Sequence, residues 1–486
     1  MIFMKKYQYF VIILVVIPLL NSCSPVSETL ANNSPAASYL PSSPTEPPTF
    51  LAPPNPPTTH FQTLILEGME NQTPDMIFHN ANIITMDEIH PQMEAIAILG
   101  DKIFAIGSND GVLALSGSET LEVNLAGNTL LPGFIDSHGH WIGDREYTNF
   151  DSHDQVIQYL VQNGWTSINE MFVSPDRIDE LVSLDNEGKL PLRVNAYLPV
   201  NFLDQRFGQP YLAYQPLQQL SPHVRIAGVK FFADNDWGLV INWDQVELNQ
   251  EVAAAHTAGW QIAIHNLSSA GLELALVSLA HSLGDEDNST YRHRLEHLPE
   301  MTDLQLAEIS SRGYLGSIQL TLPGYILAID KEFEQKVSED RLDLLYRYRD
   351  LWDTGTLVVG STDFPWFTKD EFTFLTGAPA GSPMRLVYEA MIHVDPSGNI
   401  PAYWMDDQYP ELMDVLRSLT INGAYATFEE DLKGSLMPGK FADMVILTDS
   451  PLEVNVNRID DIRVLATLIG GSVEFCLNGA ESLCGF

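Results

Sequence analysis

An apolar run at residues 129–135 leads within a few residues to His138-Gly139-His140. The run predicts a β-strand, although a Pro-Gly pair interrupts it. On an extended chain, residues i and i+2 project to the same face, so both imidazoles can converge on one metal ion. Gly139 keeps the backbone between them small. Two surface histidines after a turn would have the same sequence, so the choice between these interpretations depends on the rest of the chain.

Downstream of this pair, short apolar or β-branched segments alternate with helical patterns. Together with the strand before His138 they make eight β/α units over about 300 residues, the size of a (β/α)8 barrel. The sequence therefore predicts an α/β fold with a TIM barrel as its main domain. The strands are expected at residues 166–171, 192–198, 226–233, 261–265, 292–297, 314–318 and 357–363, and helices at 154–163, 245–258, 270–282, 303–312 and 340–353.

Residues able to bind metal lie along or at the ends of several of these strands. Lys230 lies inside an otherwise apolar strand, while His265, His297 and Asp363 each end one. Active sites of this architecture form at the carboxyl edge of the barrel, where all the strands end. Thirteen histidines are scattered along the chain, so a few could fall there by chance. Their order along the strands favours a metal site instead.

A different sequence pattern, of short β-like runs separated by turns, flanks the barrel region on both sides. Short β-like runs at 77–86, 95–99, 102–106 and 120–125 are separated by turns, including one at 108–111, and two more runs follow at 444–447 and 464–469. Clusters of Asn, Asp and Gly between them are typical of turns. We therefore expect one small antiparallel β-sandwich domain that is assembled from both ends of the chain.

The first residues have the features of an export signal. Lys5 and Lys6 precede an apolar run at 9–20, which is shorter than the about 20 residues that a spanning helix needs. The sequence then reads Leu-Asn-Ser-Cys up to Cys23 and looks like a bacterial lipobox, which implies lipidation of Cys23. An ordinary signal peptide with an incidental cysteine is the alternative. The proline-rich stretch that follows predicts an extended tether to the membrane.

Charge and cysteine content limit the partners. The formal net charge is −39, which makes nucleic acid an improbable partner and repels anionic headgroups. Membrane attachment is therefore expected through the lipid anchor only, outside the cytoplasm. Cys476 and Cys484 would permit a disulfide in that setting, with two free thiols as the alternative.

Several segments together carry a family resemblance. PGFIDSHGH, VKFFAD, IHNLSSAGLELAL, RHRLEHL and GSTDFP, with GSLMPGKFADMVIL near the C-terminus, resemble the metal-dependent amidohydrolase superfamily, and most closely its family 3, the YtcJ-like branch. The resemblance covers roughly residues 75–470. The ordered motifs are specific for the superfamily but say little about the substrate.

The resemblance implies a ligand set for one or two divalent ions, with zinc as the expected metal. His138, His140 and Asp363 are implied to bind one ion, and His265 and His297 a second. Lys230 matches a position where many relatives bridge the two metals with a carboxylated lysine. Neutral imidazole and carboxylate suit Zn²⁺, whereas an ammonium cannot be a ligand. A lysine paired with Asp234 or Asp236 is the alternative.

The implied reaction is hydrolysis of a non-peptide carbon–nitrogen bond of amide or N-acyl type in a small-molecule substrate. The metal would supply a hydroxide near neutral pH, and Asp363 would be the catalytic residue that moves its proton to the leaving nitrogen. One alternative keeps the metal site but acts on an ester, lactone or phosphoester. Another is a non-catalytic solute-binding lipoprotein, for which a damaged ligand set would be expected.

This sequence departs from the family pattern in its loops. The segments at 234–238 and 266–269 differ from those of relatives, and Trp141 follows the histidine pair where a smaller residue or proline is frequent. Glu170 and Arg294 could face the pocket or be structural. Relatives often form dimers, so a homodimer is compatible with the resemblance, although the sequence shows no interface.

The expected organisation has five parts. They are a signal peptide at 1–22, a lipidated cysteine and linker at 23–62, a β-sandwich at 63–131 plus 432–475, a metal-dependent hydrolase barrel at 132–431 and a C-terminal tail at 476–486.

Overall fold

A computed structural model of the protein describes residues 62–145, 148, 150–202, 204–235, 238, 240–321, 339–365, 381–392 and 407–484. The predicted signal peptide, Cys23 and almost all of the predicted linker lie outside these residues, as does Asp236, one of the two predicted partners of Lys230. Within the described part of the chain, no helix is long and apolar enough to cross a membrane.

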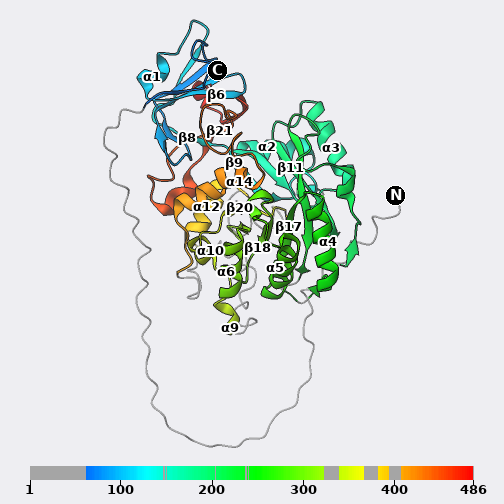
Figure 1. Ribbon diagram of the computed structural model, residues 1–486. Helices are drawn as coiled ribbons and strands as arrows, with labels where there is room; N and C mark the ends of the chain where they lie inside the picture. Colours follow the sequence, from blue (N-terminus) through cyan, green and yellow to red (C-terminus); the bar gives the residue numbers. More distant parts are fainter. Residues whose placement is uncertain are drawn as a thin grey trace, which may run out of the picture. The chain divides into compact units, whose positions relative to one another are not determined.

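Eight parallel strands form a nearly closed barrel (Figure 1). Their spatial order follows the order along the chain, and each strand pairs in parallel with the next. The predicted barrel is therefore confirmed. Its strands are β9 (Phe134–Gly139), β10 (Trp165–Glu170), β11 (Arg193–Pro199), β14 (Val224–Phe232), β17 (Gln261–Asn266), β18 (Arg294–His297), β19 (Leu315–Gln319) and β20 (Val358–Ser361).

Helices separate the strands, and several begin at side-chain caps. Ser152, Ser268 and Thr302 each accept a hydrogen bond from a backbone N–H in the first turn of the helix that follows. The helices are α2 (His153–Gln162), α3 (Pro175–Asn186), α4 (Gln245–Thr257), α5 (Ser269–Leu283), α6 (Asp303–Arg312), α9 (Glu339–Leu342), α10 (Tyr348–Asp353), α12 (Pro383–Ile392), α13 (Leu412–Ser418) and α14 (Ile421–Ala426).

One predicted helix is wrong in its extent. Residues 340–353 form the two short helices α9 and α10 rather than one long helix. The chain turns between them at Tyr346, whose φ of 48° lies in the left-handed region that a helix cannot contain. The Tyr346 N–H donates to the carbonyl of Pro299, which fixes this turn against the end of the barrel.

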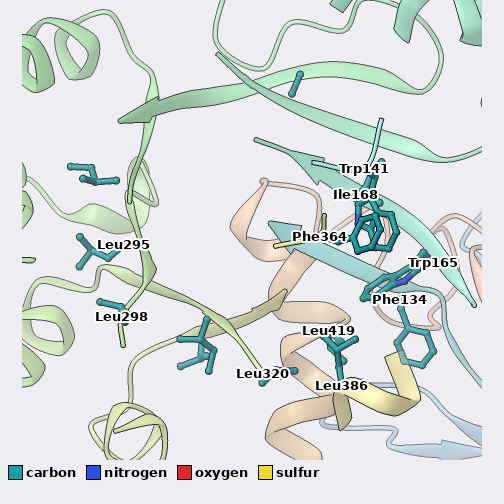
Figure 2. Packing of buried hydrophobic residues seen from close by; sticks show 14 of the residues in the cluster. Phe134, Trp141, Trp165, Ile168, Leu295, Leu298, Leu320, Phe364, Leu386 and Leu419 are labelled. Carbon is teal, nitrogen blue, oxygen red and sulfur yellow. The ribbon is translucent and has the colours of Figure 1, made fainter. Parts of the chain in front are cut away.

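A continuous hydrophobic core fills the space between strands and helices. Figure 2 shows part of it, with Trp141 beside Phe364 and Phe134 near Trp165. The Trp141 and Phe364 rings are stacked with centroids 4.0 Å apart, and the Phe134 and Trp165 rings meet edge to face at 6.2 Å. Trp141 directly follows His140, so its stacking on Phe364 packs the chain beside the histidine pair.

Two mixed sheets are built from the terminal regions. The five-stranded sheet contains β1 (Leu64–Ile65), β6 (Lys102–Gly107), β5 (Ala95–Leu99), β2 (Met76–His79) and β7 (Leu121–Asn124). The six-stranded sheet contains β23 (Ser472–Cys476), β22 (Val464–Ile469), β21 (Met444–Leu447), β8 (Thr129–Pro132), β3 (Asn82–Ile84) and β4 (Gln92–Met93). Strands from both chain ends thus share one sheet, as expected.

The expectation of a purely antiparallel module is wrong. Strand β2 pairs in parallel with β7, and β3 pairs in parallel with β8. Each parallel pair needs a crossover connection, and between β6 and β7 that connection contains the short helix α1 (Asn109–Leu113). The sequence predicted only a turn there. Ser108 caps this helix by accepting from the Gly111 N–H, so the same turn residues start a helix.

The strand predicted at 129–135 is interrupted. It divides at Gly133 into β8, which pairs with β21 in the six-stranded sheet, and β9, which begins the barrel. A Cβ atom at Gly133 would lie 2.2 Å from the Thr166 methyl carbon, so only glycine fits where the chain passes from one sheet to the other. The apolar run therefore serves two sheets in succession.

A buried ion pair joins the six-stranded sheet to the barrel. Arg193 at the start of β11 donates to both carboxylate oxygens of Asp443 at 2.7 and 3.0 Å. Asp443 also accepts from the Gly470 N–H and is only 4% exposed. The bidentate geometry and the third hydrogen bond leave little of this carboxylate without a partner.

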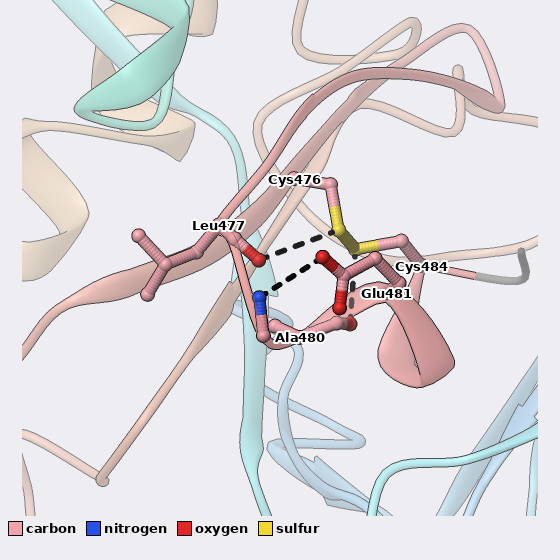
Figure 3. Close-up of a disulfide and its surroundings, with 6 residues drawn as sticks. Cys476, Leu477, Ala480, Glu481 and Cys484 are labelled. Carbon is pink, nitrogen blue, oxygen red and sulfur yellow. Dashed lines mark hydrogen bonds between the residues drawn. A yellow bond between two sulfur atoms is a disulfide. The ribbon is translucent and has the colours of Figure 1, made fainter.

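Cys476 and Cys484 form a disulfide, which decides between the two states that the sequence left open. It joins the end of β23 to the residue after the short 3-10 helix η7 (Glu481–Leu483), as Figure 3 shows. The bridge holds the C-terminal segment against the sheet to which β23 belongs.

We predict that Asp443→Ala lowers the free energy of unfolding by about 3–5 kcal/mol, because it leaves the largely buried Arg193 guanidinium without a counter-charge. Urea denaturation followed by circular dichroism measures the change. Glu187→Gln is the control, since it removes one partner of the exposed pair with Lys189 and should leave the midpoint unchanged. An unchanged midpoint in Asp443→Ala would contradict a stabilising role for this pair.

Candidate metal centre

The two histidines at the end of β9 lie as their spacing predicts, with both Nε2 atoms directed at one carboxylate. Their ring centroids are 5.5 Å apart, and both side chains are buried. Gly139 is needed between them because a Cβ atom there would lie 2.6 Å from the Trp141 ring and 2.9 Å from Asp136 Oδ2. A larger residue would push the two imidazoles out of line.

Asp363 lies opposite the histidine pair, just after β20. Its Oδ1 is 3.4 Å from His138 Nε2 and 3.4 Å from His140 Nε2, and the three residues group their ligand atoms within 4.8 Å. The Asp363 N–H donates to the carbonyl of His138. Its φ of 51° is unusual for a residue other than glycine, and such strained backbone is often found at functional sites.

His265 and His297 complete a cluster of four imidazoles. The His297 ring lies 4.3 Å from that of His265 and 4.8 Å from that of His138, measured between centroids. His297 Nδ1 is 2.7 Å from Gln319 Oε1, so the ring donates there and keeps Nε2 for a ligand. The structure thus brings all five predicted histidine and aspartate ligands to one edge of the barrel.

Lys230 is fully buried on β14 beside this cluster, with Nζ 3.4 Å from His138 Nε2. Burial lowers the pKa of Lys230 to about 8, although Glu296 and Asp363 oppose the shift. The alternative pairing with Asp234 is wrong, because that carboxylate accepts from the Leu267 N–H and the Ser268 hydroxyl instead. The described residues contain no ion-pair partner for Lys230.

Sequence reasoning missed a supporting ion pair beneath His138. Glu296 Oε2 lies 2.6 Å from His138 Nδ1, and Arg294 donates to both oxygens of Glu296. Burial would raise the pKa of Glu296, but Arg294 and His138 hold it well below its ordinary value. The ionised carboxylate fixes the Nδ1–H tautomer of His138 and leaves Nε2 for a metal. Arg294, which the sequence left open, is therefore structural.

A second missed residue, Asp136, fastens β9 to the end of β20. Its carboxylate accepts from the backbone N–H and the hydroxyl of Thr362 and from the Trp141 indole N–H. Burial raises the pKa of Asp136 to about 6 against these hydrogen bonds. The hydrogen bond to Asp136 thus explains why a tryptophan stands at position 141, where this chain departs from the family pattern. The signal available in the sequence was an aspartate inside a buried strand.

Glu170 at the end of β10 positions the loop after the histidine pair. It accepts from the backbone N–H groups of Ile142 and Gly143 at 2.7 and 3.3 Å. Burial raises the pKa of Glu170 to about 7, while these bonds lower it. Glu170 therefore holds the segment that follows His140, and it is not one of the candidate metal ligands.

Protonation states suit cation binding at most of these ligands. Burial, followed by the Lys230 charge, lowers the pKa of His138 to about 3, and burial also lowers the pKa of His265. For Asp363, burial opposes the facing imidazoles, but they lower its pKa to about 2. For His140, burial opposes Asp144 and Asp363, which raise its pKa to about 10. A cation that binds there has to displace this proton.

The donor set fits a divalent cation. Two buried ring nitrogens, Nε2 of His265 and Nε2 of His297, have no hydrogen-bond partner among the described residues, and Oδ1 of Asp363 has only its 3.4 Å contacts with the imidazoles of His138 and His140. Buried polar atoms without a partner cost free energy unless something binds them. Imidazole nitrogen and carboxylate oxygen are the ligands that zinc and similar ions prefer.

Comparison with a family model agrees with this geometry. A model described as the amidohydrolase family matches residues 146–475 of the 486. The matched region includes Lys230, His265, His297 and Asp363 but begins after His140. Assignment of the histidine pair therefore depends on its distances to Asp363.

Three curated proteins are similar over parts of their length. LONG AFTER FAR-RED 3 of Arabidopsis thaliana is 24% identical over 349 residues, which are 65% of this chain and 56% of that protein. YtcJ of Bacillus subtilis is 21% identical over 308 residues, 59% of this chain and 53% of that protein. N-substituted formamide deformylase of Arthrobacter pascens is 22% identical over 242 residues, which are 49% of this chain and 41% of that protein. The chain thus spans about half the length of these relatives.

Among solved structures, an uncharacterized metal-dependent hydrolase from Pyrococcus horikoshii OT3 has a similar fold. Its TM-score is 0.64 at 19% identity, and the match covers 79% of this chain and 99% of that one. At this identity the likeness concerns the fold, which agrees with the barrel and the mixed sheets described above.

We predict that Glu296→Gln weakens divalent metal binding about 10- to 100-fold, because His138 loses the charged acceptor that orients it. Metal competition against a chromogenic chelator measures the affinity. Glu389→Gln is the matched control, since it breaks the buried pair of Glu389 with Arg385 in α12. Equal metal affinities in the two variants would show that Glu296 has no part in orienting the ligand.

Proposed function

The chain belongs to the amidohydrolase family, and from that premise we propose that it hydrolyses a non-peptide carbon–nitrogen bond of amide or N-acyl type. The observation that carries this proposal is the position of Asp363 Oδ1, 3.4 Å from the Nε2 atoms of both His138 and His140. One carboxylate can then serve a metal and move a proton beside it. The substrate is proposed to be a small molecule that enters at the carboxyl edge of the barrel.

A divalent cation held by His138, His140 and Asp363 would polarise the substrate carbonyl and acidify a water to a pKa of about 7. Asp363 accepts the proton of the attacking water and returns it to the departing nitrogen. His138 is kept in the required tautomer by Glu296, and Glu170 holds the loop after His140 in place. The buried surroundings of Lys230 and His265 exclude bulk water from the reacting groups.

The choice of a carbon–nitrogen bond draws support from the family and from one similar protein, whose name states that it deformylates N-substituted formamides. Esters and lactones would fit the same metal geometry, because Asp363 can equally protonate a departing oxygen. A solute-binding role is disfavoured, because every ligand expected from the family pattern is present. His138, His140 and Asp363 group their ligand atoms within 4.8 Å, and the His297 ring lies beside those of His138 and His265.

We propose zinc as the metal and a second ion between His265 and His297. Lys230 would bridge the two ions after its amine captures CO₂ as a carbamate. Support comes from the position of its Nζ, buried 3.4 Å from His138 Nε2 and without a counter-ion among the described residues. A buried lysine with no acidic partner is otherwise a costly arrangement.

For the location of the protein, we propose an extracytoplasmic enzyme anchored through a lipid on Cys23. The apolar run at 9–20 and the lipobox-like sequence support export, and the disulfide between Cys476 and Cys484 suits an oxidising compartment. The proline-rich stretch would then hold the enzyme away from the membrane surface.

We predict that Asp363→Asn retains the fold but lowers kcat/KM roughly 10²- to 10⁴-fold, because the amide cannot accept the water proton. Matched amide and ester substrates with identical acyl groups, assayed with the zinc-loaded full chain, measure both the loss and the preferred bond. Asp154→Asn, at an exposed position in α2, is the control for purification and metal loading. Undiminished turnover in Asp363→Asn would refute its role, and ester-only turnover would replace the amide proposal.

We predict that Lys230 carries a carbamate. Protein reconstituted with zinc and isotopically labelled bicarbonate should show a carbamate carbon signal by nuclear magnetic resonance, and Lys230→Met should lack it. Metal analysis of the same samples should find less bound zinc in Lys230→Met. A wild-type spectrum without this signal, at full metal content, would show that the lysine is not a bridging ligand.

A further inference from the structure

Four phenylalanines cluster at the mouth of the barrel, and we call them the phenylalanine wall: Phe172, Phe202, Phe207 and Phe232. The Phe172 ring has its centroid 5.5 Å from each of the other three. Phe232 meets both Phe172 and Phe202 edge to face, at 88°. These distances and angles are those of well-formed aromatic contacts.

The wall begins at the candidate metal centre. Phe232 follows Lys230 by two residues on β14, so the two side chains project to the same face of the strand. The centroid of the Phe232 ring is 4.7 Å from that of His265 and 5.2 Å from the Lys230 Nζ. An aromatic surface therefore starts within contact distance of two predicted ligands.

Exposure increases along the wall, away from the metal centre. Phe232 is 6% exposed, Phe172 and Phe202 are half-buried, and Phe207 is 38% exposed. A structural core would be closed to solvent on all sides, whereas this cluster runs from a buried ligand to the surface. Apolar surface that stays open beside polar, chemically active groups is characteristic of ligand sites.

Hydrogen bonds hold the wall in place before any ligand arrives. Asn201 clamps the backbone of Phe232 by accepting from its N–H and donating to its carbonyl, at 3.0 and 3.1 Å. The short strand β12 (Asn201–Phe202) pairs with β13 (Gln205–Arg206). Arg206 then donates to the carbonyl of Asn242. Phe172 is held at a φ of 64°, a left-handed conformation that is costly for an aromatic residue.

We propose that the phenylalanine wall binds an uncharged aromatic substituent of the scissile amide and so determines substrate choice. This inference rests on the proposed function, since the aromatic substituent belongs to the amide that the metal centre is proposed to cleave. Phenyl rings offer edge-to-face contacts to an aromatic guest that an alkyl chain cannot reproduce. The net charge of −39 disfavours anionic substituents, and the four phenyl rings carry no charge that could pair with an ionic group.

The test compares two matched pairs of amides on the zinc-loaded full chain: phenylacetamide with acetamide, and N-phenethylacetamide with N-ethylacetamide. Amine or ammonia release gives kcat/KM for each. We expect the aromatic member of at least one pair to be favoured more than about tenfold. Phe202→Ala and Phe207→Ala should reduce that ratio to about threefold or less. The ratio is the readout because altered stability or metal content would affect both amides equally.

Phe475→Ala is the matched control. This phenylalanine is also half-buried, but it lies on β23 in the six-stranded sheet, and its loss should leave the ratio unchanged. An equal ratio in the wild type and both wall variants would overturn the inference, while loss of turnover in Asp363→Asn would still support the proposed function.

If no amide is hydrolysed, the proposed function fails and binding decides the inference separately. Calorimetry would then compare N-phenethylacetamide with N-ethylacetamide on the wild-type protein and the two wall variants. Tighter binding of the aromatic amide that Phe202→Ala abolishes would support the wall as an aromatic site. Equal binding of both amides would show that the cluster only packs the barrel mouth.

Discussion

Closure of the barrel between β9 and β20 is the constraint on which the metal centre depends. The two strands are first and last in the sheet, and the Asp136 carboxylate links them by accepting two hydrogen bonds from Thr362. Just after β20, the Asp363 N–H adds a bond to the carbonyl of His138 on β9. The ligands therefore straddle the seam, and their mutual distances exist only once residues more than 200 positions apart have joined.

Burying several charged groups in the barrel costs free energy, and the arrangement of the site limits that cost. Arg294 and Glu296 are both fully buried, and each would be strongly destabilising alone. Their pairing leaves a nearly neutral unit whose remaining acceptor capacity fixes His138. Among the residues that the structure describes, Lys230 has no ion-pair partner, so its buried charge is costly unless it is removed or balanced. The proposed carbamate with bound cations would do both, and the metal would then contribute to the stability of the barrel interior.

The sequence predicted where the candidate ligands would meet because parallel strands all end at one edge, so histidines and an aspartate at those ends had to converge. It could not predict which neighbours support them. Glu296 and His297 are adjacent, and on a regular strand they would face opposite sides. The φ of 77° at His297 breaks that alternation and turns both toward the metal centre. The division of the 129–135 run likewise depended on Gly133 and a strand near the other chain end, contacts too distant for local pattern to reveal.

The barrel mouth divides into a half that carries the chemistry and a half that carries the wall. The predicted histidine and aspartate ligands lie on or just after β9, β17, β18 and β20. The phenylalanines lie on or after β10, β11 and β14, and β14 also carries Lys230. The two halves meet where β14 pairs with β17, in a register that sets Phe232 beside His265. A shift of one residue there would turn Lys230 and Phe232 away from the centre together. The pairing that places Lys230 would thus also fix where the proposed recognition surface begins, and changes in substrate preference could then accumulate along the wall while the ligands stay in place.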